Sequence, residues 1–263
     1  MRLKIVLIFL LMIVLASTGV AEENVKFASL EWEPYVGPEM RNNGYVAEIV
    51  VEAFRRVDYK TEIIFFPWAR AVKMAESGEL DGVFPEYYDE SRKEQFVFSD
   101  PFPGGPVGLY KRKESGVAYS INPQINQTEA FRGLQDSMFG VVRGYINTAE
   151  FDAAAFLKKE EVISDELNLK KLYNRRIDYI FIDKFVAEHL IKHKFPSYEA
   201  DLEFMHPALE VRLLYIAFSK QAEDYQNKLK AFNSGLQQIT QDGTLARIMN
   251  QHGIDENSNY VEE

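Results

Sequence analysis

The sequence predicts an α/β protein. Short apolar runs typical of strands alternate with segments whose apolar residues recur at helical spacing, and this alternation continues along most of the chain. Alternating units of this kind favour sheets that are covered by helices. The chain has 263 residues, of which 46% are hydrophobic, so it is long enough to form two packed cores. Periodicity alone does not indicate how many lobes these elements form.

The first half of the chain is expected to alternate strands and helices. Apolar residues recur at helical spacing from Val46 to Val57. Pro67 suits the start of a helix, because its missing N–H would have no helical partner there, and Gly78 suits the end. Pro85 is expected to stop the strand before it. These signals predict strands at 25–30, 61–66, 80–84, 96–99 and 107–111, and helices at 44–57 and 67–78.

The second half begins with a polar segment, 114–128, and then continues the alternation. The apolar run at 177–182 is typical of a buried strand, and the run at 211–218 is typical of a long one. Gly243 and Gly253 are suitable helix terminators. We expect strands at 139–142, 161–163, 177–182 and 211–218, and helices at 148–158, 165–174, 184–193, 221–241 and 244–251.

Residues 1–21 predict export. Arg2 and Lys4 precede an apolar run at 5–15, and small residues end at Ala21, which is the pattern of a cleaved secretory signal peptide. An uncleaved membrane anchor is the alternative, although the apolar run is short for a membrane span. The chain has no cysteine, which excludes disulfides and a lipid-modified cysteine. We therefore expect a periplasmic protein that is not a lipoprotein.

The charge balance is acidic. The formal net charge is −10, and loss of Arg2 and Lys4 with the leader would make it −12. Affinity for nucleic acid depends on basic side chains that neutralise phosphates. The composition therefore argues against a nucleic-acid partner.

The stretch 67–102 carries the most informative motifs. A helix that opens with the aromatic residue Trp68 is followed by S-G-x-x-D at 77–81, by Arg92 in a polar loop and by F-S-D-P-F at 98–102. Each motif is loose alone. Their order and spacing together resemble the periplasmic solute-binding proteins of family 3, which are the receptors of ABC importers for polar amino acids and related solutes.

The resemblance covers about 25–253 and implies the type II periplasmic binding protein fold, with two α/β lobes joined by a two-strand hinge. Lobe one would hold 22–108 and 213–263, and lobe two would hold 109–212. Closure of such a hinge around a ligand is a known kind of domain motion. The implied partners are a small amino-acid-like ligand and an inner-membrane ABC permease. We expect a monomer without a cofactor, a metal or catalytic residues.

Three side chains of the predicted first lobe match ligand-binding positions of the family. Trp32 and Trp68 are the only tryptophans in the chain, and they fall where family members sandwich the ligand between aromatic rings. Two tryptophans that fill the core are the alternative. Arg92 stands seven residues before Ser99, at the spacing of the family's carboxylate-binding arginine, whose planar fork pairs with a carboxylate. A solvated arginine in a charged loop is the alternative there.

Further candidates lie in the predicted second lobe. Asp183 follows a buried strand, and the resemblance implies that it accepts the ligand's α-amino group. It is equally suited to cap the helix that starts at Lys184. The glycine turn that ends at Gly144 would present backbone N–H groups to an anionic group of the ligand, and Arg143 could add a cation.

The chain departs from the family pattern in three ways. The spacing from Asp81 to Arg92 is one residue shorter than usual. Bulky residues stand at 84–88, where amino-acid receptors have small hydroxyl residues or glycine, and Tyr145 and Ile146 replace serine or threonine. These changes predict a ligand that is aromatic, cationic or otherwise unlike a small standard amino acid. Glu86 is a candidate to face an amino group of that ligand.

The sequence is compatible with two other classes of function. A dehydratase-like enzyme of the same fold would need a positioned acid or base such as Glu86. A ligand-sensing protein would dock on a sensor in place of a permease. His189 and His193 are four residues apart, which is typical of a zinc pair, but a third ligand is missing and a solvated helix face is the alternative.

Overall fold

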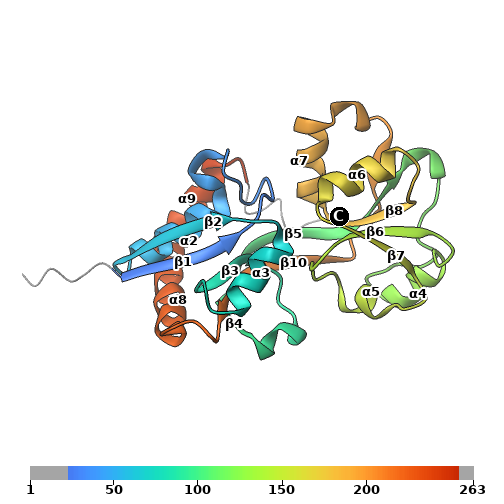
Figure 1. Cartoon of the computed structure of the whole chain (residues 1–263). Coiled ribbons are helices and arrows are strands. Elements are labelled where there is room, and N and C mark those ends of the chain that lie inside the picture. Colours follow the sequence, from blue (N-terminus) through green and yellow to red (C-terminus); the bar gives the residue numbers. More distant parts are fainter. Residues whose placement is uncertain (1–22, 255–263) are drawn as a thin grey trace, which may run out of the picture.

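The computed structural model describes residues 23–254, and Figure 1 shows them as two α/β bodies side by side. The predicted signal peptide at 1–21 lies outside the described residues. Within them, no helix has the length and apolar character needed to cross a membrane. The strands of both bodies belong to one continuous ten-stranded sheet, whose main path runs β2-β1-β3-β10-β5-β8-β6-β7.

The first lobe is built on a mixed sheet. β1 (Glu23–Ser29) lies between β2 (Tyr59–Phe65) and β3 (Gly82–Glu86) and is parallel to both. β10 (Glu210–Ser219) runs antiparallel to β3 and also pairs with β4 (Phe96–Phe98). Its helices are α2 (Tyr45–Arg55), α3 (Trp68–Glu76), α8 (Tyr225–Gln241) and α9 (Thr244–Gln251). α2 packs on β2 and α8, and α3 packs on β1 and β3.

The second lobe repeats this arrangement. β8 (Tyr179–Asp183) runs antiparallel to β5 (Phe102–Arg112) and parallel to β6 (Met138–Val142). β7 (Lys158–Val162) extends the sheet beyond β6, and β9 (Leu202–Phe204) pairs with β5. The helices of this lobe are α4 (Gln127–Arg132), α5 (Ala149–Ala153), α6 (Asp165–Tyr173) and α7 (Lys184–Lys194). Short 3-10 helices are η1 (Arg41–Asn43), η2 (Glu90–Glu94), η3 (Lys113–Ser115) and η4 (Pro196–Tyr198).

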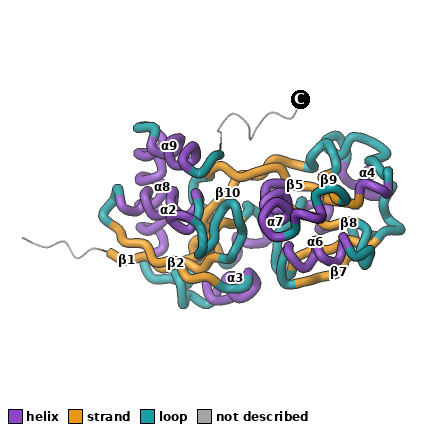
Figure 2. Tube along the Cα trace, turned by 90° about the horizontal axis from the view of Figure 1, so that it is seen from above, coloured by secondary structure: helices purple, strands orange, loops and turns teal. Residues whose placement is uncertain are grey.

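Two long antiparallel strands, β5 and β10, join the lobes and are visible between the two bodies in Figure 2. This arrangement confirms the predicted fold class of two α/β lobes joined by two strands. The predicted lobe boundaries, at 108/109 and 212/213, fall within these strands and stay predictions. The register between the strands shifts between Arg212 and Leu214, where the ladder is irregular.

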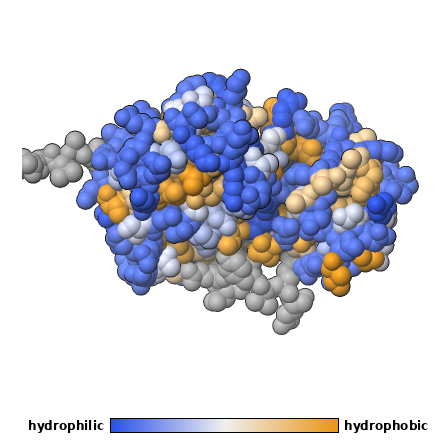
Figure 3. Space-filling view, turned by 90° about the horizontal axis from the view of Figure 1, so that it is seen from below, coloured by the Kyte–Doolittle hydropathy of each residue, from blue (hydrophilic) through white to orange (hydrophobic). Residues whose placement is uncertain are grey.

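Each lobe has its own aromatic core. Phe27 contacts Phe54 and Phe218 in the first lobe, with ring centroids 5.6 Å apart in both pairs. In the second lobe, Phe151 contacts Phe131 and Phe139 edge to face. All of these rings are fully buried. The surface is largely hydrophilic in the view of Figure 3, with hydrophobic side chains in several separate groups.

Most predicted elements are present, and the differences have physical reasons. The prediction that Pro85 stops its strand was wrong, because β3 continues to Glu86. Its pairing with β10 is irregular between Tyr215 and Ala217, so no regular ladder bond requires an N–H from proline. The helix expected at 148–158 is shorter in the structure, where α5 ends at Ala153.

At β7, α4 and β9 the local sequence pattern was too weak to predict the element correctly. β7 begins at Lys158, three residues before the strand predicted at 161–163. It is an outer strand of the sheet with four charged residues, which conceal its strand character in the sequence. The short elements α4 and β9 were not predicted.

Asp81, the last residue of the S-G-x-x-D motif, has a structural role. Its carboxylate accepts the backbone N–H of Lys26 at 2.7 Å and pairs with the Nζ of Lys228 at 2.6 Å. It therefore links the start of β3 to β1 and to α8 in the first lobe. Only 12% of the Asp81 side chain is exposed, so water cannot easily replace these partners.

We predict that Asp81→Ala lowers the free energy of unfolding by about 1–3 kcal/mol, because a backbone donor and an ammonium group lose their acceptor. Glu79→Ala is the control, since Glu79 is exposed in the same turn. Chemical denaturation of both variants measures the difference. Equal stability of the two variants would contradict a structural role for Asp81.

Candidate functional site

Ends of parallel strands from both lobes meet at one place. Trp32 follows β1 and Trp68 follows β2 in the first lobe, while Tyr145 follows β6 and Asp165 follows β7 in the second. All four side chains line the same cavity between the lobes. The carboxyl ends of parallel strands are where open α/β sheets usually bind ligands. The topology therefore places this cavity where a ligand site is expected.

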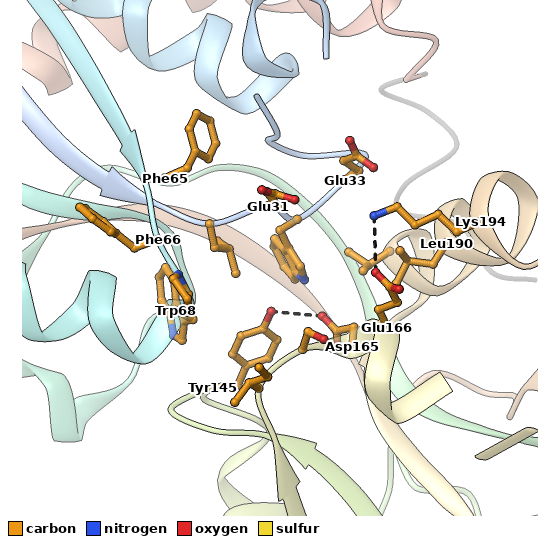
Figure 4. Close-up of a pocket in the computed structure, with 16 residues that line it drawn as sticks. Glu31, Glu33, Phe65, Phe66, Trp68, Tyr145, Asp165, Glu166, Leu190 and Lys194 are labelled. Carbon is orange, nitrogen blue, oxygen red and sulfur yellow. Dashed lines mark hydrogen bonds and ion pairs between the residues drawn. The ribbon is translucent and has the colours of Figure 1, made fainter. Parts of the chain in front are cut away.

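We call this cavity the outer chamber; its volume is about 300 Å³. Figure 4 shows aromatic rings on one side and acidic side chains on the other. The Tyr145 hydroxyl donates to Asp165 at 3.1 Å, and the Nζ of Lys194 lies 3.7 Å from Glu166. The lining residues are Leu30, Glu31, Trp32, Glu33, Phe65, Phe66, Pro67, Trp68, Tyr145, Ile163, Ser164, Asp165, Glu166, Val186, Leu190 and Lys194.

A smaller cavity of about 20 Å³ shares four of these walls, and we call it the inner chamber. Glu86, at the end of β3, is the one acidic side chain among its lining residues. Four aromatic rings also line the inner chamber, those of Trp32, Trp68, Tyr87 and Tyr145. The complete lining is Leu30, Trp32, Trp68, Pro85, Glu86, Tyr87, Tyr145, Ile146 and Leu214.

Neighbouring rings of the inner chamber stand nearly perpendicular to one another. Trp32 meets Tyr87 at 80° and Tyr145 at 80°, and Trp68 meets Tyr145 at 87°. The centroid distances in these pairs are 5.8, 6.4 and 6.3 Å. Trp32 also stacks on Tyr35 at 4.6 Å, which supports it from behind. The walls are therefore rigid aromatic surfaces that are held by their own contacts.

Asp183, the predicted amino-group acceptor, already has partners from both lobes. Its Oδ2 accepts the hydroxyls of Tyr35 at 2.8 Å and Tyr87 at 3.1 Å. Its Oδ1 accepts the backbone N–H groups of Phe185 and Val186, at 2.9 and 3.1 Å. The predicted helix cap is thus present, and Asp183 does not line either chamber.

Arg92 and Trp68 of the first lobe both bind the carbonyl of Gly144 in the second. The Arg92 guanidinium donates to that oxygen at 2.8 Å, and the Trp68 indole donates at 3.1 Å. Arg92 also lies 3.6 Å from Glu86 and 3.7 Å from Glu76. Gly144 adopts φ +82°, a conformation that favours glycine, so the predicted glycine turn is present. Arg92 lines neither chamber.

The structure thus brings together only part of the predicted site. Trp32, Trp68 and Glu86 line the chambers, whereas Asp183 and Gly144 make contacts between the lobes. Arg143 lies away from both chambers: its side chain is 60% exposed and pairs with Glu161 at 3.2 Å. These ligand-binding roles stay predictions.

Several site residues were missed from the sequence. Asp165 lies two residues after the strand predicted at 161–163, so its position near a strand end was a usable signal. Tyr35 and Arg212 carried no such signal. Arg212 donates to the carbonyls of Asn147 at 2.6 Å and Tyr88 at 2.9 Å, and its guanidinium lies 4.3 Å from the Tyr87 ring centroid. It therefore links the loops of both lobes from the crossing strand β10.

His189 is engaged with the other lobe. Its Nε2 lies 3.1 Å from the Glu33 carboxylate, and its ring centroid is 4.3 Å from that of His193. Burial and the neighbouring His193 lower the pKa of His189. Among residues 23–254, no group of three or more histidine, aspartate or glutamate side chains has an arrangement that could hold a metal ion.

Three carboxyl groups at the site are buried. Burial raises the pKa of Asp165, Asp183 and Glu86 to about 7 in each case. The Tyr145 hydroxyl limits this rise for Asp165, and the Arg92 charge limits it for Glu86. Removal from water is the dominant cause at all three positions. These carboxyls are therefore protonated more readily than solvated ones, and a nearby positive charge would favour the ionised form.

Comparison with known families gives a match over nearly the whole described chain. The profile of the bacterial extracellular solute-binding proteins, family 3, matches residues 28–255. A comparison with curated proteins finds no match.

Solved structures share the architecture at low sequence identity. An ancestral arginine-binding protein bound to arginine is 19% identical, with a TM-score of 0.70, covering 87% of this chain and 97% of that one. The GluR0 ligand-binding core from Nostoc punctiforme, in complex with L-glutamate, is 14% identical at 0.69, covering 86% and 98%. A histidine kinase sensor domain with similarity to periplasmic binding proteins is 15% identical at 0.73, covering 88% and 96%. At these identities the likeness shows the fold.

The buried carboxyls predict that stability falls as pH rises. The folded-state pKa of Asp165, about 7, is above its unfolded value of roughly 4. Its contribution is therefore full below about pH 4 and is lost as pH rises towards about 7. We predict that Asp165→Asn removes on the order of 1 kcal/mol per pH unit of this dependence between about pH 5 and 7.

Denaturation of the wild-type protein and of the variant across that pH range measures the effect. Asp136→Asn is the control, because Asp136 is exposed in the same lobe. Identical pH slopes for Asp165→Asn and the wild-type protein would contradict the prediction.

Proposed function

Because the chain belongs to family 3 of the bacterial extracellular solute-binding proteins, we propose that it captures a small amino-acid-like solute between its lobes and delivers it to an ABC importer. The family assignment supports a ligand-binding receptor. The amino-acid-bound proteins that share its fold support the ligand class.

One observation supports this proposal more than any other: the outer chamber is lined from both lobes. Trp32 and Trp68 come from the first lobe, and Tyr145 and Asp165 come from the second. A ligand in this chamber would touch both lobes at once and would favour the arrangement in which they are close. Binding energy would then drive closure, because only the closed form makes every contact.

Hydrogen bonds between the lobes support the same mechanism. Tyr35 and Tyr87 reach Asp183, and Trp68 and Arg92 reach the Gly144 carbonyl. Each would form as the lobes approach and would be exchanged for water as they separate. Such exchange gives small net free energies, so a ligand of ordinary affinity is able to shift the balance.

We further propose that the protein acts in the periplasm after removal of the leader at 1–21, as a monomer, and that it binds its solute without converting it. The leader pattern supports export. A sensor is the alternative receiving partner, and a sensor domain of a histidine kinase shares the fold.

We predict that ligand binding changes the tryptophan fluorescence, since both indoles line the chambers. Trp68→Ala should weaken binding by about 1–3 kcal/mol, the scale of a desolvated aromatic contact. Calorimetry and melting curves on Trp32→Ala and Trp68→Ala separate a binding role from a core role. A stability loss of roughly 3–5 kcal/mol with affinity retained would favour tryptophans that only fill the core.

Transport is tested in the source cells. A thermal-shift screen of amino acids, polyamines and small carboxylates identifies the solute, and mass spectrometry of the recovered solute reports any conversion. We expect an unchanged solute, and lower uptake of that solute in cells that lack this chain. Unchanged uptake together with a lost transcriptional response would favour a sensor, and a converted solute would favour the enzyme.

A further inference from the structure

The cations near the chambers are engaged with protein groups. Lys194 is the one basic side chain among the described residues that line either chamber, and it pairs with Glu166 at 3.7 Å. Arg92 donates to the Gly144 carbonyl and lies beside Glu86 and Glu76. Among the described residues that line the chambers, Lys194 is therefore the only cation that a ligand carboxylate would meet, and it stands beside an acidic side chain.

Acidic groups, in contrast, face the chambers in excess. Four acidic side chains line the outer chamber, Glu31, Glu33, Asp165 and Glu166, against the single lining cation Lys194. Glu33 also contacts His189 at 3.1 Å and Glu166 pairs with Lys170 at 2.7 Å, so Glu31 and Asp165 carry the excess. Asp165 is 5% exposed, and no ion pair joins it to a basic side chain in the part of the chain that the structure describes. The outer chamber is therefore suited to a positive group.

Glu86 provides a second acidic position, deeper in the molecule. Its side chain is 3% exposed, and its Oε1 accepts the backbone N–H of Tyr87 at 2.9 Å. Its Oε2 is buried without a hydrogen-bond donor, because the Nε of Arg92 is 3.6 Å away. An ammonium group in the inner chamber would supply that missing donor.

The walls around Glu86 suit a cation equally well. A positive group within about 6 Å of an aromatic centroid is attracted by the ring, most strongly by tryptophan. Trp32, Trp68, Tyr87 and Tyr145 all line this small chamber. Its volume of about 20 Å³ admits a compact head group, and the shared walls lead to the larger outer chamber.

We propose that the ligand is an organic dication, an aliphatic diamine or an aminoguanidine, with one cationic head beside Glu86 in the inner chamber and the other by Asp165 in the outer chamber. The methylene linker lies between the aromatic walls, and a carboxylate on the ligand does not contribute to binding. This inference rests on the proposed receptor function and specifies the ligand of that same site.

Matched ligand pairs test the inference on the wild-type protein. Agmatine and L-arginine differ only by the carboxylate, as do cadaverine and L-lysine. By calorimetry we expect the two amines to bind more tightly than their amino acids, by about tenfold or more, because a carboxylate would lie among acidic side chains. Equal or tighter binding of the amino acids overturns the inference and leaves the receptor function intact. If the protein binds neither the amines nor any standard amino acid, that result counts against the receptor function itself.

A variant pair tests the role of Glu86 separately. We expect Glu86→Gln to weaken cadaverine binding by about tenfold or more, since a charged partner becomes neutral while its oxygen still accepts the Tyr87 N–H. Glu79→Gln, an exposed change in the same lobe, should bind as the wild-type protein does. Unchanged affinity in a Glu86→Gln protein with a wild-type melting temperature overturns the inference. If this variant does not fold, the comparison of the matched ligand pairs alone tests the inference.

Discussion

The carboxylate of Asp183 connects the two lobes and the local structure at the site. It ends β8 and caps α7 through two backbone N–H groups, so the second lobe depends on it locally. Its other oxygen accepts two tyrosine hydroxyls from the first lobe. A buried carboxyl without such partners is costly, whereas four donors satisfy this one. The contacts between the lobes and the start of α7 therefore depend on the same side chain.

Around Asp183, the polar groups that join the lobes are different from the groups that face the chambers. Polar groups that join the lobes, such as Asp183 and the Gly144 carbonyl, are occupied by protein donors. The surfaces left facing the chambers are indole and phenol rings with Glu86 and Asp165 among them. A ligand in such a site would be held by charge and shape more than by a pattern of hydrogen bonds.

The sequence could predict the fold and part of the site. Strand and helix periodicity located most elements. The family resemblance located Trp32 and Trp68, and a departure from the family pattern indicated Glu86; all three line the chambers. The sequence could not show that the Asp183 carboxylate already accepts hydrogen bonds from other protein groups, because its partner Tyr35 is 148 residues away in the chain. Arg212 was equally hidden, since only the crossing of β10 brings it to the loops of both lobes. Contacts between distant segments are fixed by tertiary packing and leave no local pattern.

The glycine pair in β5 has a consequence for how this receptor can diversify. A Cβ at Gly104 would lie 2.2 Å from the backbone oxygen of Arg212, and one at Gly105 would lie 2.2 Å from the hydroxyl of Tyr35. No larger side chain fits at either position without moving the crossing strands or the tyrosine that binds Asp183. If this crossing is kept, a change of ligand preference would therefore have to come from other positions, such as the chamber-lining side chains after β1, β2, β6 and β7 and at the end of β3. A receptor altered in that way would accept a new solute while the two strands that link its lobes keep their packing.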